Sequence, residues 1–187
     1  WDVVLAGRNA AAGSAAMTRI ADMVRQPRAS FEPLDLASLV SIGQFADRMR
    51  ETGLSLDLLV NNAGIMSPPQ RRQTSDGFEL QLGVNHLGHF ALTAGLLPLL
   101  QRAPAARVVS VTSLAMHHAK GDPFADLQCE ARYRAGPAYC RSKLFQAMFA
   151  AELQRRSASA GWNLSSFAAH PGFASTNLFG AGPGGVQ

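Results

Sequence analysis

Tyr139 and Lys143 are the residues whose types and spacing most clearly suggest chemistry in this sequence. The surrounding segment 137–156 has apolar residues at helical spacing, and residues four apart on a helix share one face. A phenol has a pKa of about 10, and a nearby ammonium favours the phenolate. Stabilising the phenolate by about 4 kcal/mol would let the pair exchange protons near neutral pH. The alternative is a helix face with an exposed Lys and a half-buried Tyr.

Three short apolar segments end in polar or glycine-bearing turns, and helical patterns lie between them. The segments are 56–60, followed by 61–64 (NNAG); 107–113, which ends in Thr112 and Ser113; and 163–169, followed by 170–172 (HPG). A fourth strand is expected at Val3–Ala6, and helices at 10–25, 38–51, part of 76–100 and 137–157. This alternation predicts a single α/β domain over 1–187. We expect a Rossmann-like, doubly wound, mostly parallel sheet with helices on both faces and a site where the strands end.

Several motifs in a fixed order resemble the short-chain dehydrogenase/reductase family. They are 61–64 (NNAG), Asn85, Ser113, 139–143 (YCRSK) and 171–176 (PGFAST), and the resemblance extends from Val3 to Thr176. The stretches 81–93 and 124–133 are similar to the retinol-dehydrogenase-like branch of that family. Each motif alone is weak, whereas the ordered set is specific.

The resemblance implies an oxidoreductase that transfers a hydride between NAD(P) and an alcohol or carbonyl compound. Tyr139 would be the general acid and base, Lys143 would lower its pKa, and Ser113 would bind the substrate oxygen. Asn85 would hold a water that connects Lys143 to solvent. The further residues that the resemblance places at the cofactor, together with Tyr139 and Lys143, are Asn62, Ala63, Gly64, Pro171, Gly172 and Thr176.

The residues after the first expected strand bear on the choice of cofactor. Gly7 and Arg8 follow this strand, and neither is the acid that would bind the ribose 2′-hydroxyl of NAD. Arg8 could accept the 2′-phosphate of NADP, so NADP is favoured over NAD, although Arg8 is also one of many surface arginines. The resemblance places Asp35 and Leu36 beside the adenine ring, but Asp35 could instead be a carboxylate near a helix N-terminus.

The sequence departs from the family pattern at both ends. The Gly-rich turn that cradles the pyrophosphate does not occur, and Trp1 lies at the start of what resembles the second strand of the family. The strand without a counterpart would be the central one of the sheet, and the Gly-rich segment 180–187 is not followed by a last helix and strand. We therefore expect a fold that is incomplete at both ends and belongs to a longer enzyme. The alternative is a non-catalytic dinucleotide-binding or oligomerisation module.

Composition excludes several other classes of function. The net charge of +4 comes from scattered arginines, so we expect no nucleic-acid partner. The longest apolar stretch, 90–100, is too short to span a membrane, and a cytoplasmic location is expected. Cys129 and Cys140 have no metal-type spacing and are interpreted as reduced and packed.

Two pairs on the expected helices leave alternatives open. His86 and His89 could bind a metal, but no second suitable pair is near them, so we expect no metal and interpret both as packing residues. Phe145 and Phe149 could contact a second copy of the chain, which makes a homodimer possible, or they could pack in the core.

Overall fold

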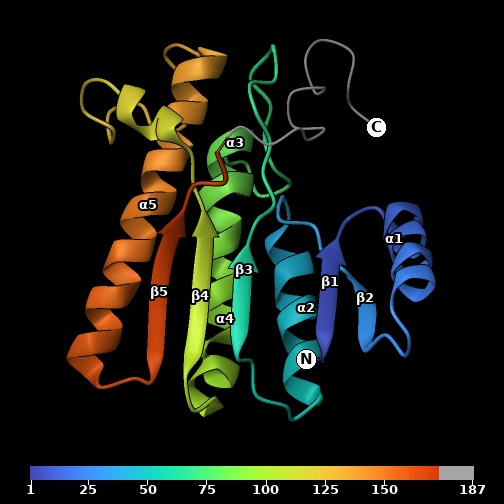
Figure 1. Ribbon diagram of the computed structural model, residues 1–187. Coiled ribbons are helices and arrows are strands. Elements are labelled where there is room, and N and C mark those ends of the chain that lie inside the picture. The colour runs from blue at the N-terminus through green and yellow to red at the C-terminus, as the bar shows by residue number, and fades with distance from the viewer. Residues whose placement is uncertain (173–187) are drawn as a thin grey trace.

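The computed structural model describes residues 1–172 and contains five strands, all paired in parallel. They form a two-stranded sheet of β1 (Val3–Gly7) and β2 (Ala29–Pro33), and a three-stranded sheet in the order β3 (Leu58–Asn61), β4 (Ala106–Val111), β5 (Leu164–Ala169). The arrows point the same way, so all five carboxyl ends lie at one edge (Figure 1). The predicted parallel α/β architecture is confirmed.

The helices begin and end where local signals indicate. Helix α1 (Ala10–Met23) is capped by Asn9, whose Oδ1 accepts from the N–H of Ala12 at 2.9 Å. Ser38 caps α2 (Leu39–Glu51) through the N–H of Ser41. The long helix α5 (Ala135–Ala160) ends at Gly161, whose φ of 65° is the left-handed conformation that glycine adopts readily. A short 3₁₀ helix, η2 (Leu114–His118), follows β4.

The helical pattern in 76–100 corresponds to one continuous helical segment with an irregular turn near its start. Helix α3 (Leu80–Leu82) continues through a π-helical turn, η1 (Gly83–Leu87), into α4 (Gly88–Arg102). Pro98 lies in the last turns of α4, and the residue is exposed. Single π-turns inside helices frequently occur at functional sites.

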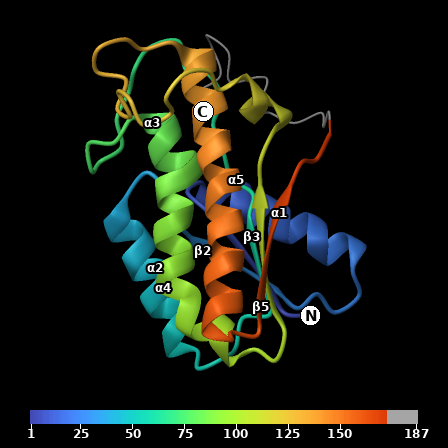
Figure 2. The ribbon, with the colours of Figure 1, turned by 90° about the vertical axis from the view of Figure 1, so that its left-hand side faces the viewer.

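The helices form layers on either side of the strands. Helices α2, α4 and α5 cover one face, and α1 lies on the other face beside β1 and β2 (Figures 1 and 2). Helix α1 approaches closely because Gly13 faces Phe31, where a Cβ atom would lie 2.4 Å from the ring. No described helix covers the other face of β3–β5, where Val60 and Phe167 are about half exposed.

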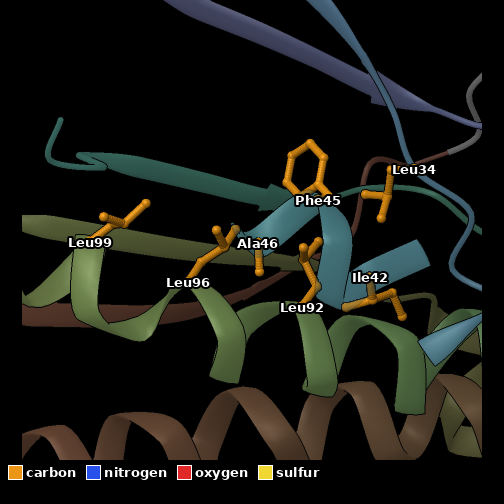
Figure 3. Close-up of a cluster of buried hydrophobic side chains, with 7 residues drawn as sticks. All are labelled: Leu34, Ile42, Phe45, Ala46, Leu92, Leu96 and Leu99. Carbon is orange, nitrogen blue, oxygen red and sulfur yellow. The ribbon is translucent and has the colours of Figure 1, made fainter. Parts of the chain in front are cut away.

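The main apolar core holds α2 against α4. It comprises Leu34, Ile42, Phe45, Ala46, Leu92, Leu96 and Leu99 (Figure 3). A second cluster packs α5 against β4 and β5 around Leu100, Val108 and Leu153. Burying a side chain of this size contributes about 1.5–3 kcal/mol, so these clusters fix the helices that carry the site residues.

The two sheets are not hydrogen-bonded to each other. Among the described residues, β1 and β3 are the strands that face this break, and neither pairs across it. Val3 and Val4 of β1 and Leu58 of β3 are 39–46% exposed. The break lies where the sequence analysis expects the central strand of the family.

Candidate active site

The carboxyl end of β4 and the first turns of α5 bring the predicted catalytic residues together. Thr112 and Ser113 follow the last residue of β4, and Tyr139 and Lys143 lie on α5. The Thr112 hydroxyl donates to the carbonyl of Lys143 at 2.9 Å, which ties the strand end to the helix. This contact holds the two segments in register independently of either reactive group.

Lys143 is buried and its ammonium has a defined partner. Its side chain is 4% exposed, and Nζ donates to the carbonyl oxygen of Val111 at 2.9 Å. Burial lowers the pKa of Lys143 to about 8, because a charge is less stable away from water. Nζ lies 6.0 Å from the centre of the Tyr139 ring, so the two side chains share one helix face as their spacing predicts.

Tyr139 differs from the sequence-based expectation in the direction of its pKa shift. Burial raises the pKa of Tyr139, and the side chain of Ser113, within hydrogen-bonding reach, opposes that rise. The Lys143 ammonium donates to the carbonyl of Val111, and the net direction of the pKa shift of Tyr139 is upward. The Ser113 hydroxyl also accepts from the N–H of Ala115 at 3.2 Å, which fixes its position at the start of η2.

Asn85 connects the turn after β3 to α5. It is fully buried in the π-turn η1, its Oδ1 accepts from the N–H of Ile65 at 2.9 Å, and its Nδ2 donates to the carbonyl of Ile65 at 3.0 Å. Nδ2 also donates to Ser142 Oγ at 2.9 Å. The polar atoms of the Asn85 side chain are therefore bonded to Ile65 and Ser142. A water held by Asn85, as the sequence analysis expects, would have to bind an atom outside these side-chain contacts.

Gly64 is the point where these groups meet. A Cβ atom there would lie 3.3 Å from Asn85 Oδ1 and 3.5 Å from Lys143 Nζ. The turn thus passes beside the ammonium because it lacks a side chain. Asn62 and Ala63 in the same turn are exposed, so their backbone is open to a ligand. An open backbone beside a buried ammonium and a phenol suits a ribose, which presents hydroxyls to such donors.

The other predicted cofactor residues are less closely grouped. Pro171 and Gly172 are exposed just after β5, and Thr176 lies outside the described residues. Arg8 is exposed after β1 and forms no ion pair within residues 1–172. The structure brings Gly64 to Asn85 and Lys143, two of the predicted catalytic residues, whereas Arg8 follows β1 in the other sheet.

Asp35 and Leu36 have local partners in the turn before α2. The Asp35 carboxylate accepts from the N–H of Ala37 at 2.9 Å, and its own N–H donates to Ser41 Oγ. Leu36 packs against the main core, and its carbonyl oxygen faces Gly88. The proximity of Asp35 to a helix start is therefore observed, and a contact of this pair with adenine stays a prediction.

Sequence reasoning missed two buried residues that organise the site. Ser142 accepts from Asn85 and donates to the carbonyl of Tyr139 at 2.8 Å. Gln81 accepts from the N–H of Ser67 and donates to the Tyr133 hydroxyl and the carbonyl of Ala135. Spacing could have identified Ser142, which is three residues from Tyr139 on the same helix. No local signal could have identified the partners of Gln81.

The two histidines pack inside the helical layer. The ring of His86 lies 5.6 Å from the ring of Phe145, and His89 is 2% exposed with its Nδ1 3.1 Å from the carbonyl of Asn85. Burial lowers the pKa of each to about 4, so both are neutral at physiological pH. Phe145 is buried and Phe90 is 52% exposed on the same surface.

Two further observations delimit the site. A cavity of about 390 Å³ beside Arg107, Trp162 and Leu164 contains none of the predicted site residues, and it lies at the amino ends of β4 and β5. We do not assign chemistry to it. In residues 1–172, no helix combines the length and the apolar character needed to cross a bilayer.

Comparison with known proteins gives close matches over most of the chain. The sequence profile for short chain dehydrogenase matches residues 1–182. Human retinol dehydrogenase 12 is 42% identical over 176 residues, which are 94% of this chain and 54% of the relative. Mouse polyprenol dehydrogenase is 45% identical over 181 residues, 95% of this chain and 53% of the relative. The chain therefore spans about half the length of these relatives.

Solved structures match in the same way. The crystal structure of an uncharacterised protein from Mycobacterium paratuberculosis superposes with a TM-score of 0.78 at 42% identity, covering 96% of this chain and 62% of that one. An NADP active-site complex from Pseudomonas aeruginosa has a TM-score of 0.72 at 25% identity, with 95% and 63% covered. An NAD complex from Burkholderia phymatum, at 19% identity and a TM-score of 0.73 with 95% and 59% covered, shares the fold.

Proposed function

This chain belongs to the short-chain dehydrogenase family, and we propose that it carries the catalytic residues of an oxidoreductase acting on an alcohol or carbonyl compound. The observation that carries the proposal is the placement of Tyr139, Ser113 and Lys143 around the carboxyl end of β4. A packing role alone would not require a phenol, a hydroxyl and a buried ammonium at one sheet edge.

The residues have distinct roles in the proposed reaction. In reduction, the Tyr139 hydroxyl donates its proton to the substrate oxygen, and the Ser113 hydroxyl donates a hydrogen bond to the same oxygen. In oxidation, Tyr139 receives that proton. In the proposed complex, the Lys143 ammonium would donate to ribose hydroxyls of the cofactor as well as to the carbonyl of Val111, and its positive charge would then favour the phenolate. NADP(H), when bound, supplies or accepts the hydride.

The substrate class follows from the relatives only as a proposal. The two relatives described above are named for retinol and polyprenol, which are both isoprenoid alcohols. We propose an apolar alcohol or its carbonyl counterpart. We propose that the connection 114–136, which leads into α5, and the region after Phe173 select among such substrates.

A Tyr139→Phe substitution tests the proposed chemistry. We expect turnover to fall by a factor of about 10²–10⁴, because the proton donor is lost, while NADPH affinity changes little. Turnover of an alcohol panel and quenching of NADPH fluorescence measure the two effects separately. If the unsubstituted protein binds NADPH but turns over no substrate, the non-catalytic dinucleotide-binding module is the correct interpretation. Unchanged turnover in the variant would reject Tyr139 as the acid and base.

NADP is the proposed cofactor in preference to NAD. The support is Arg8, which is exposed after β1 and has no ion-pair partner within residues 1–172. We expect Arg8→Gln to weaken NADPH binding by about tenfold, a typical effect for a charge-assisted contact to phosphate, and to leave NADH binding unchanged. Equal losses for both cofactors would show that Arg8 does not read the 2′-phosphate.

Two further properties stay proposals. A homodimer through the outer surface of α4 and α5 is supported by Phe90, which is 52% exposed beside the rings of His86 and Phe149. Sedimentation of the wild-type protein and of Phe90→Asp tests it, and a monomeric wild type would reject it. A cytoplasmic location is supported by the unpaired thiols Cys129 and Cys140, and localisation of a tagged protein in cells tests it.

A further inference from the structure

A small cavity lies beside the start of α5, apart from the catalytic residues. Its volume is about 120 Å³, and neither Tyr139 nor Lys143 lines it. Its walls come from the segment 119–134 and the first turns of α5. The charged residues in these walls are Lys120, Asp122, Arg132, Arg134 and Arg141.

The charges around this cavity are strongly unbalanced. Four of the lining side chains are cationic and one is a carboxylate. None of the four cations takes part in an ion pair within residues 1–172. Like charges gathered around one cavity repel each other, so this arrangement costs free energy until an anion is added.

Arg141 is held in place by neutral groups. Its guanidinium donates to the carbonyl oxygens of Ala125, Asp126 and Leu127 at 3.0–3.2 Å and to Cys129 Sγ at 2.8 Å. The nearby carboxylate of Asp126 accepts from three backbone N–H groups at residues 130–132, and its negative charge offsets part of the charge of Arg141. Arg141 is therefore a fixed cation whose charge is only partly offset.

The start of α5 adds to the imbalance. Its N-cap residue is Arg134, no side chain caps its first turn, and no acidic residue lies in that turn. The first N–H groups of a helix carry a partial positive charge. Cationic side chains at the same end repel this charge and raise the free energy of the helix end. Pro137 and Ala138 of this turn line the cavity. An anion in the cavity would offset both the helix end and the arginines.

We propose that this cavity binds one phosphate group, held by Lys120, Arg132 and Arg134 beside the fixed positive charge of Arg141. Guanidinium groups bind phosphate through paired charge-assisted hydrogen bonds. The volume equals that of about four water molecules in the liquid, which suits a compact oxyanion. The phosphate could belong to a soluble phosphate compound or to a phospholipid headgroup. The proposal does not depend on the oxidoreductase activity, since a protein without turnover could still bind phosphate here.

Titration with inorganic phosphate, followed by ³¹P NMR, tests the site directly. We expect the double variant Arg132→Gln/Arg134→Gln to bind phosphate about tenfold more weakly than the wild-type protein, because two charge-assisted contacts are lost. Both side chains are exposed, so the fold should persist, and circular dichroism checks this. The matched control is Arg155→Gln/Arg156→Gln, which removes the same charge near the other end of α5 and should keep the wild-type affinity.

Two further arms separate other sources of binding. Arg8→Gln should keep the phosphate affinity, whereas a loss there would place the phosphate at the cofactor site. A second arm uses vesicles of phosphatidylcholine with phosphatidic acid. If the phosphate belongs to a phospholipid headgroup, the vesicles should retain the wild-type protein but not Arg132→Gln/Arg134→Gln. If the phosphate belongs to a soluble compound, the vesicles should retain neither protein. The proposal is wrong if the wild type binds no phosphate, or if the two double variants lose affinity equally.

Discussion

The two sheets differ in how firmly they hold the groups assigned to them. Around β3, β4 and β5, the polar side chains of Asn85, Ser142 and Gln146 are at most 1% exposed. Asn85 donates to Ser142, and Gln146 contacts His89, whose Nδ1 lies 3.1 Å from the carbonyl of Asn85. Around β1 and β2, the one buried residue of α1 is Gly13, and no residue of β1 is buried. The proposed chemistry thus lies on the well-packed part, and the proposed cofactor discrimination by Arg8 lies on the more exposed part.

This contrast indicates that the two parts make different demands on structure. Proton transfer needs reacting groups within hydrogen-bond reach, so small displacements of Tyr139 or Ser113 are costly. Recognition of a phosphate by a long arginine side chain tolerates more movement. The buried hydrogen bonds that Asn85 and Ser142 make to each other and to the backbone provide the rigidity that the first task needs.

The largest effect is expected from removing the centre of the buried network. Asn85→Ala removes the side-chain partner of both the N–H and the carbonyl of Ile65, and Ser142 Oγ loses one donor but keeps its bond to the carbonyl of Tyr139. Two buried polar groups that lose partners cost about 4 kcal/mol in the free energy of unfolding. Urea denaturation measures this loss. A loss below 1 kcal/mol, on the scale of a single net hydrogen bond, would mean that the network is not the source of rigidity.

An effect of intermediate size is expected for the pH dependence of the free energy of unfolding, and it arises from His86 in the well-packed part. The folded-state pKa of His86 is about 4, below its unfolded value of about 6.5, so the unfolded chain binds the proton more readily between these values. The stabilising contribution is complete above pH 6.5 and is lost as the pH falls toward 4. At pH 5 the loss from His86 is about 2 kcal/mol relative to pH 7.5.

The variant His86→Phe isolates this contribution. Phenylalanine can keep the contacts with the rings of Phe90, Phe145 and Phe149 but cannot take up a proton. Urea unfolding at pH 7.5 and pH 5 should show a smaller difference in the variant, by about 2 kcal/mol. His118→Asn in the exposed helix η2 is the control and should keep the full difference. An identical pH response in His86→Phe and the wild type would contradict the assignment.

The smallest effect is expected in the other part. Asn9→Ala removes the cap of α1, which should lower the free energy of unfolding by about 1 kcal/mol. Turnover should not change, because α1 contacts β1 and β2 and none of the catalytic residues. Assays of the same preparation for stability and activity check both statements. A fall in turnover as large as that of Asn85→Ala would remove the distinction between the two parts.

Much of the local structure could be predicted from the sequence. Helices α1 and α2 begin within one residue of the expected starts at 10 and 38, and β1, β4 and β5 lie within about two residues of the apolar segments that indicated them. Such features depend on neighbours a few residues away, so periodicity and capping chemistry report them. The irregular turn η1 was not predicted, because periodicity does not distinguish a single π-turn from the α-helix around it.

The sequence by itself determined that a phenol and an ammonium share one helix face beside a strand end, since a spacing of four residues is enough to place them. Only the tertiary structure decided that the Lys143 ammonium donates to the carbonyl of Val111 and that burial raises the pKa of Tyr139. It also decided that Asn85 holds Ile65 and Ser142, which are 20 and 57 residues away in the chain. Hydrogen-bond partners and desolvation depend on which distant segments pack together, and no local pattern encodes them.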